Sequence, residues 1–274
     1  MAYPTNESPL VNKILPQEDV DALYNLYPNL PRSYMAGCPS CGKNNGYGVN
    51  GTVELDGEVY ECNCRDQLQL HKHYLDAGIG KTYQFLTWKD FYGDQDAMNK
   101  VIEWIDRAEE HIESGSGLYI YSAEYGSGKT FVATMALRSC IKLGYKCYMT
   151  TFQNMIANIK SGWKDTNFDK WYKRKVDSSQ ILLIDDLGKE LDGAAGFTMD
   201  FAKQTLDSMF RTRVQQGKVT MFTSNMSAGE MAHTYGQAVG SLFNECTEPI
   251  KMKAVTGDYR QQVDKNLVGY RYIY

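Results

Sequence analysis

The residues best suited to chemistry form the run Ala123-Glu-Tyr-Gly-Ser-Gly-Lys-Thr130, which follows an apolar stretch and precedes a helical one. Glycines in such a turn let backbone N–H groups surround a phosphate, and the dipole of the following helix favours the anion. This is the phosphate-loop pattern, with Ala123 where a glycine is usual. We predict that Lys129 reaches the β- and γ-phosphates of ATP and that Thr130 binds Mg²⁺. The predicted nucleotide-binding residues are Tyr125, Gly126, Ser127, Gly128, Lys129, Thr130 and Phe131. The alternative is a glycine-rich turn beside an unrelated lysine.

Two carboxylates end a later apolar run, Ile181-Leu-Leu-Ile-Asp185-Asp186. We predict that Asp185 holds Mg²⁺, directly or through water, as carboxylates do at magnesium sites. Asp186 stands where a base that orients the attacking water is needed. Asn225 ends the next apolar run and is predicted to contact the γ-phosphate or that water. The alternatives are an ordinary strand with an acidic turn and, for Asn225, a helix cap.

Four of the seven cysteines fall within 27 residues, as Cys38-Pro-Ser-Cys41 and Cys62-Asn-Cys64. In a chain without a secretion signal, clustered cysteines are more typical of metal ligands than of disulfides. Four thiolates suit a closed, tetrahedral and structural Zn²⁺ site. The alternatives are an iron–sulfur cluster, a redox pair or unliganded cysteines, and we expect His71 and His73 to be surface residues of a helix.

Basic and aromatic residues are interleaved in Thr151–Val176, which has a local net charge of +4. Cations for the backbone and aromatic rings for the bases are typical of a surface that binds single-stranded DNA. The predicted contact residues are Lys160, Lys164, Lys170, Trp171, Lys173 and Arg174. The alternative is a solvated helix whose aromatic side chains pack on the sheet.

The elements that position these residues alternate between helix and strand from about residue 97, beginning with a helical stretch over Ala97–Glu113. The expected strands are Leu118–Ser122, Tyr145–Thr150, Gln180–Asp185, Val219–Thr223 and Pro249–Met252. Each is short and apolar, which is typical of buried parallel strands. The alternation predicts an α/β fold, a doubly wound parallel five-stranded sheet with helices on both faces.

The N-terminal third has a different organisation. Residues 1–33 are proline-rich and predict a tether with one short helix over residues 17–27. Residues 34–78 combine the cysteines with a hairpin, signalled by Asp56-Gly57, and a helix over Arg65–Ala77. Residues 79–96 form a connector, and residues 97–274 form the nucleotide-binding domain.

Composition excludes several classes of protein. The chain has 274 residues, of which 43% are apolar and 23% charged, so collagen-like, coiled-coil and wholly disordered structures are not expected. The formal net charge of −4 provides no global attraction to nucleic acid, so any DNA contact must be local. Without an eighteen-residue apolar run or a signal peptide, we expect a cytoplasmic protein with no membrane partner.

Five motifs together resemble the bacterial and phage replicative helicase loaders of the DnaI/DnaC type, which are AAA+ ATPases. They are the four-cysteine knuckle, Leu75-Asp-Ala-Gly-Ile79, Gly-x-Gly-Lys-Thr130, Ile-Asp-Asp-Leu-Gly-Lys-Glu190 and Thr223-Ser-Asn225. The resemblance implies an AAA+ (ASCE P-loop) module that oligomerises on a hexameric DnaB-type helicase. It implies that the module helps to place the helicase on single-stranded DNA under ATP control during replication initiation, with residues 1–75 docking on the helicase. About twenty residues follow the last expected strand, too few for the helical lid of many AAA+ proteins, which agrees with a lidless loader.

One feature departs from the AAA+ pattern. In these proteins an arginine of the neighbouring subunit stabilises charge on the transferred phosphoryl group. Residues 226–250 contain no arginine or lysine, and Leu242 stands near the expected position. We predict that Arg213 substitutes, with Arg211 and Arg260 as alternatives, and that hydrolysis by the chain alone is slow. Two other functions stay open: a transposition helper ATPase of the IstB kind, and a phage nucleotide-switch adaptor that captures the helicase with little hydrolysis.

Overall fold

A computed structural model describes residues 25, 38, 41, 51–62, 64–162, 170–189 and 198–254 of the chain. These residues divide into two compact units. The smaller unit holds the described residues up to Thr87 together with Ile141–Gly144, and the larger holds Trp88–Cys140 and the described residues from Tyr145 onward. The division at Thr87 falls inside the predicted connector, and the four predicted domain ranges remain predictions. Apart from Asn25, the short helix predicted over residues 17–27 lies outside the described residues.

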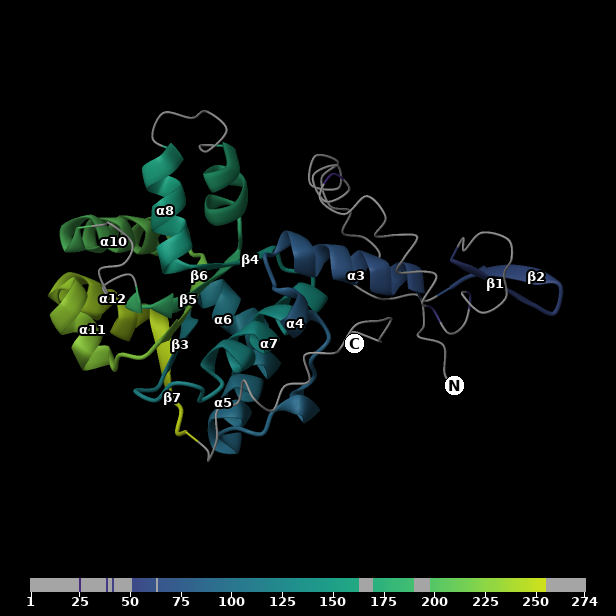
Figure 1. Ribbon diagram of the computed structural model, residues 1–274, viewed down its shortest axis with the longest axis horizontal. Helices are drawn as coiled ribbons and strands as arrows, with labels where there is room; N and C mark the ends of the chain where they lie inside the picture. The colour runs from purple at the N-terminus through teal and green to yellow at the C-terminus, as the bar shows by residue number, and fades with distance from the viewer. Residues whose placement is uncertain are drawn as a thin grey trace. The chain divides into compact units, whose positions relative to one another are not determined.

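The larger unit contains a parallel sheet of five strands (Figure 1). They are β3 (Gly117–Tyr121), β4 (Cys147–Thr151), β5 (Ile181–Leu187), β6 (Val219–Ser224) and β7 (Thr247–Lys251). Each strand begins and ends within two residues of its expected position, so the doubly wound five-stranded sheet is confirmed. The order is β4-β5-β6-β3-β7, which sets β6 between the strand of the phosphate loop and the strand that carries the two carboxylates. Pro249 lies in β7 at the edge of the sheet, where its missing N–H costs least.

Helices cover both faces of this sheet (Figure 1). One face is covered by α8 (Phe152–Gly162), α10 (Met199–Gln215), α11 (Ala228–Tyr235) and α12 (Gln237–Cys246). Their apolar side chains pack with Tyr119, Leu182 and Phe222 of the strands. The opposite side is covered by α5 (Gln95–Asp106), α6 (Ala108–Ser114) and α7 (Lys129–Lys142). The smaller helical turns are η2 (Trp88–Asp90) and η3 (Lys173–Asp177).

The single helix predicted over Ala97–Glu113 is wrong, because the structure has two helices there. Arg107 leaves the helical region with φ −110° and ψ 25°, and its N–H donates to the carbonyls of Trp104 and Ile105. The turn lets the apolar residues on both sides of it face the core, since Trp104 and Ala108 are both buried. The second helix ends at Gly115, whose φ of 73° is the left-handed conformation that glycine favours at a helix end.

The smaller unit contains the predicted hairpin and helix. Strands β1 (Thr52–Leu55) and β2 (Glu58–Glu61) are antiparallel and joined by Asp56 and Gly57. Both turn residues have positive φ, 53° and 82°, as a two-residue hairpin turn requires. Helix α3 (Cys64–Asp76) follows, and α4 (Lys81–Gln84) is a short turn after it.

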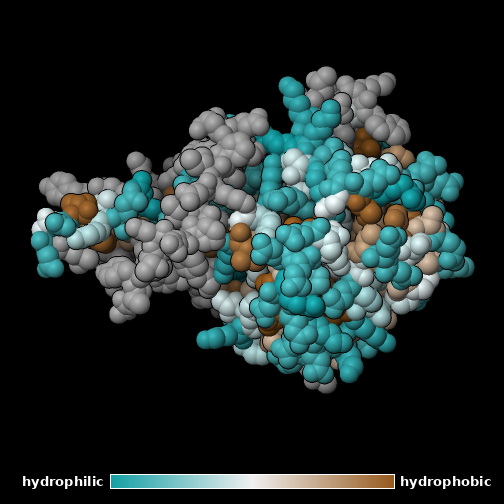
Figure 2. All heavy atoms as spheres, turned by 180° about the vertical axis from the view of Figure 1, so that it is seen from behind, coloured by the Kyte–Doolittle hydropathy of each residue, from teal (hydrophilic) through white to brown (hydrophobic). Residues whose placement is uncertain are grey.

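The described surface is mainly hydrophilic, with small apolar patches on the face seen in Figure 2. Within the described ranges, no helix has the length and apolar character needed to span a bilayer. Residues beyond Ala254 lie outside the described part, so the absence of a helical lid remains a prediction.

Candidate nucleotide-binding site and cysteine cluster

The phosphate loop connects β3 to α7 and holds the Lys129 ammonium at its centre. Gly126 and Gly128 have φ of 72° and 89°, conformations that residues with a Cβ rarely adopt. Lys129 is 7% exposed, and its Nζ donates to the carbonyl oxygens of Ser122 at 3.3 Å and Glu124 at 3.1 Å. A third hydrogen bond joins it to Ser127 Oγ at 3.3 Å. The loop therefore has the backbone shape and the buried cation that a nucleotide phosphate requires.

Tyr125 and Phe131, the first and last of the predicted nucleotide-binding residues, have different environments. Tyr125 is 74% exposed, whereas the Phe131 side chain is 1% exposed and belongs to the core. Phe131 can thus offer a nucleotide only its main chain, at the start of α7. Its ring stacks on that of Phe91, with centroids 5.2 Å apart.

Thr130 and Asp185 are 55 residues apart in the sequence and adjacent in the fold. Thr130 Oγ1 donates to Asp185 Oδ1 at 3.0 Å. The hydroxyl of Thr223, at the end of β6, donates to the same oxygen at 2.6 Å. Burial and the neighbouring Asp186 carboxylate raise the pKa of Asp185, while the two hydroxyls oppose the rise. A hydroxyl and a carboxylate side by side beside a phosphate loop are the ligand types that fit Mg²⁺.

The two acidic residues lie in a β-bulge of β5. In the pairing of β5 with β6, Ile184 lies opposite Phe222 and Leu187 opposite Ser224, so β5 has one residue more between these pairs. Asp186 lies in the bulge with φ of 57°, and its N–H donates to Thr223 Oγ1 at 2.9 Å. Bulges redirect side chains and are frequent beside active sites. The Asp186 carboxylate is directed to Lys189, with Nζ and Oδ2 2.5 Å apart.

Asn225 follows β6 and is partly buried. The helix-cap alternative for this residue is wrong, because Ser227 caps α11 and forms a capping box with Glu230. The predicted contact of Asn225 with the γ-phosphate or water stays a prediction.

Phe91 and Thr223 also shape the site, and neither was predicted from the sequence. A Cβ added at Gly128 would lie 2.6 Å from Phe91 Cε2, so this ring leaves room only for glycine in the loop. Phe91 stands in an aromatic-rich connector, where nothing in the sequence distinguishes it. Thr223 belongs to the Thr223-Ser-Asn225 motif, in which the predicted functional group was the Asn225 amide and not the Thr223 hydroxyl.

The prediction that Arg213 serves a neighbouring subunit is wrong. Its side chain is 1% exposed and its guanidinium donates to the carbonyls of Val176 at 2.8 Å and Val219 at 2.7 Å. Further bonds go to Ser179, Gln180 and Thr220. Burial lowers the pKa of Arg213 to about 10. The guanidinium thus ties strand ends together inside the unit, and Leu242 likewise packs in the core rather than at the surface.

The basic segment gives a mixed result. Lys160, Lys170 and Lys173 are exposed, Arg174 is partly buried, and Lys164 lies outside the described residues. Trp171 packs against the core, with its ring edge-on to Tyr148 at 6.1 Å. For Trp171 the structure thus agrees with the alternative, in which the aromatic side chains pack on the sheet. A ring packed in this way is less available to stack on a base. The cations remain a predicted DNA contact.

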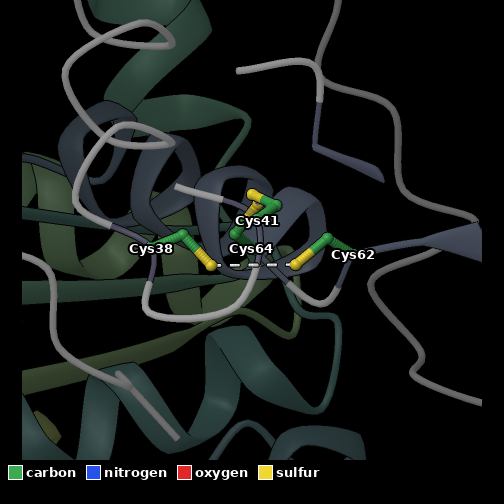
Figure 3. Close-up of side chains that lie close together, drawn as sticks. All are labelled: Cys38, Cys41, Cys62 and Cys64. Carbon is green, nitrogen blue, oxygen red and sulfur yellow. Dashed lines mark hydrogen bonds between the residues drawn. The ribbon is translucent and has the colours of Figure 1, made fainter. Parts of the chain in front are cut away.

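The four clustered cysteines converge in the smaller unit (Figure 3). Their Sγ atoms all lie within 4.8 Å of one another, with Cys38 to Cys62 at 3.7 Å and Cys41 to Cys64 at 3.3 Å. Four sulfurs at zinc-bond length from one ion would be about 3.8 Å apart, so the arrangement fits tetrahedral Zn²⁺. All four side chains are buried, and burial raises the pKa of the Cys41 thiol to about 11. Among the described residues, the candidate metal ligands of this cluster are the four cysteines alone, with no histidine or carboxylate.

Comparison with known proteins agrees with the fold and the loop. The family model for the IstB-like ATP binding protein matches residues 61–242, which include the phosphate loop and both carboxylates. The chain belongs to this family. As an IstB-like protein it has an ATP-binding domain, and the five-stranded sheet is that of the AAA+ fold.

The chain is also similar in sequence and in fold to helicase loaders. Over 208 residues the chain is 24% identical to the replicative helicase loader DnaI of Bacillus subtilis (strain 168), a match of 69% of this chain and 61% of that relative. The match thus spans less than two thirds of the relative's length. Among solved structures, the DnaC helicase loader superposes with a TM-score of 0.51 and 24% identity over 64% of this chain and all of that one. The structure of DnaI superposes with a TM-score of 0.54 and 17% identity, over 64% of this chain and 94% of that one.

Proposed function

We propose that the protein is an ATP-dependent loader of a hexameric DnaB-type replicative helicase onto single-stranded DNA. The observation that carries this proposal is the combination of the assembled phosphate loop with a zinc-type cysteine cluster preceding it in the chain. The IstB-like family and the similarity to DnaI support it.

In this proposal the protein hydrolyses ATP. Lys129 binds the β- and γ-phosphates, and Thr130 and Asp185 hold Mg²⁺, which when bound neutralises phosphate charge. Asp186 orients the attacking water, and Asn225 contacts the γ-phosphate or that water. Because α11 and α12 contain no arginine or lysine, we expect slow turnover by the isolated chain.

The smaller unit is proposed to dock on the helicase, with Zn²⁺ held by the cysteines as a structural ion. Its hairpin supports this role, since Val59 and Tyr60 on β2 are 69% and 48% exposed. Lys160, Lys170 and Lys173 are proposed to hold single-stranded DNA, and several copies of the chain are proposed to assemble on the helicase ring.

The test is a tagged pull-down from host lysate with ATP, with identification of the captured proteins by mass spectrometry. We expect a replicative helicase with the wild type, less of it with Lys129→Ala, and less with Val59→Asp if the hairpin is the docking surface. Recovery of the helicase by a chain truncated to begin near residue 80 would refute docking through the smaller unit.

A second function is favoured by the family match itself. An IstB-like transposition helper ATPase would use the same nucleotide site and act with a transposase on double-stranded DNA. Capture of a transposase, with no helicase under any nucleotide condition, would establish this alternative and overturn the first.

A further inference from the structure

Lys189, which has no role in the proposed function, forms an ion pair with Asp186. Its Nζ lies 2.5 Å from Asp186 Oδ2, and the two side chains are 36% and 25% exposed. Asp186 lies in the bulge of β5, and Lys189 lies in the turn that follows this strand. Asp186 is thus held twice, by Lys189 at its carboxylate and by Thr223 Oγ1 at its N–H.

This pairing competes with the role that the proposed function gives to Asp186, because it occupies one of the two carboxylate oxygens. A residue that orients an attacking water must offer that water a carboxylate oxygen within hydrogen-bond distance. In this structure, Oδ2 is bonded to an ammonium three residues further along the chain. Orientation of a water by this oxygen therefore requires Lys189 to release it or to share it.

We propose that Lys189 is a restraining residue, which keeps Asp186 in a resting orientation and so lowers the basal rate of ATP hydrolysis. The proposal rests on the proposed ATPase function, and it adds a regulatory element to the same site. Lys189 acts through Asp186 and is a positioning residue rather than a catalytic one.

The partial exposure of the pair limits the size of the effect. Ion pairs at this degree of exposure are screened by water and salt, so their release changes a rate by about twofold to fivefold. Salt weakens such a pair further, because the screening length falls as ionic strength rises. The restraint should therefore be strongest at low salt.

The experiment measures steady-state ATP hydrolysis and nucleotide affinity for Lys189→Gln. We expect kcat to rise about twofold to fivefold at low salt, with an unchanged Kd for a fluorescent ATP analogue. The gain should shrink as salt is added. Lys189→Arg keeps the charge and should behave as the wild type, and Lys203→Gln on α10 controls for the change in net charge. In the double variant Lys189→Gln/Asp186→Asn the gain should vanish.

An unchanged or lower kcat in Lys189→Gln would overturn the proposal, and so would a gain that survives Asp186→Asn. Thermal unfolding of each variant shows whether the fold is kept. Failure of the loader function is scored separately, by helicase capture: a chain that hydrolyses ATP and responds to Lys189→Gln, but captures no helicase, refutes the loader and leaves the restraint standing.

Discussion

Replacement of Thr223 by valine tests whether its hydroxyl organises both acidic residues of the site. The side chain is fully buried, donates to Asp185 at 2.6 Å and accepts from the Asp186 N–H at 2.9 Å. Valine keeps the branched shape but removes the hydroxyl, so a carboxylate loses a donor and an N–H loses its acceptor. A hydrogen bond to a charged group contributes about 1.5–3 kcal/mol, and an unpaired buried group costs about 1–3 kcal/mol. Because Asp186 is partly exposed, we expect the free energy of unfolding to fall by about 2–4 kcal/mol.

Thr223→Ser is the matched control, since it keeps the hydroxyl and removes one methyl group, at a cost of about 1 kcal/mol. Unfolding in urea followed by circular dichroism gives the stability of both variants. Titration of a fluorescent ATP analogue with Mg²⁺ and with EDTA gives the metal-dependent part of the affinity. We expect the valine variant to lose that part while the serine variant keeps it. Equal stability and equal metal dependence in the two variants would refute the reasoning.

Three further predictions concern the loop, the buried arginine and the cysteines. Gly128→Ala places a Cβ 2.6 Å from Phe91 in a left-handed residue, and we expect at least about a tenfold loss of nucleotide affinity, measured by fluorescence titration. Arg213→Met leaves several carbonyls without a donor, so the free energy of unfolding should fall by about 3 kcal/mol or more, whereas an arginine serving a neighbouring subunit would affect turnover alone. The purified chain should hold one zinc ion per molecule by elemental analysis, and Cys41→Ser should lose it while nucleotide affinity stays unchanged, because the two sites lie in separate units.

The nucleotide loop and the sheet could be predicted because their signals are local. Positive φ at Gly126 and Gly128 demands glycine at those positions, and the lysine follows at fixed spacing. The strands are short apolar runs, and polar residues follow each run and mark its end. The prediction that Asp185 holds Mg²⁺ has the same local origin, because Asp185 follows such an apolar run.

The contacts that organise the acids could not be predicted, because they depend on which strands are neighbours. Thr223 contacts Asp185 only because β6 pairs with β5. The bulge in this pairing has no signature in the sequence that would predict it. Arg213 presents the reverse problem. A cation in the last turn of a helix is usually solvated and interacts favourably with the helix dipole. Arg213 lies in the last turn of α10, but its guanidinium is surrounded by the carbonyls of two strand ends and a turn.

The charged groups of the site are all held by partners within the chain, and this arrangement bears on how nucleotide would act. Lys129 is bonded to two carbonyls and a hydroxyl, which are weaker acceptors for an ammonium than a phosphate is. A phosphate that replaced these acceptors would form stronger hydrogen bonds with the Lys129 ammonium. Asp186, in contrast, is held by an opposite charge, and nucleotide binding alone supplies no anion to replace it at Lys189. In the proposed function, nucleotide binding and hydrolysis would thus be controlled at different residues, Lys129 and Lys189.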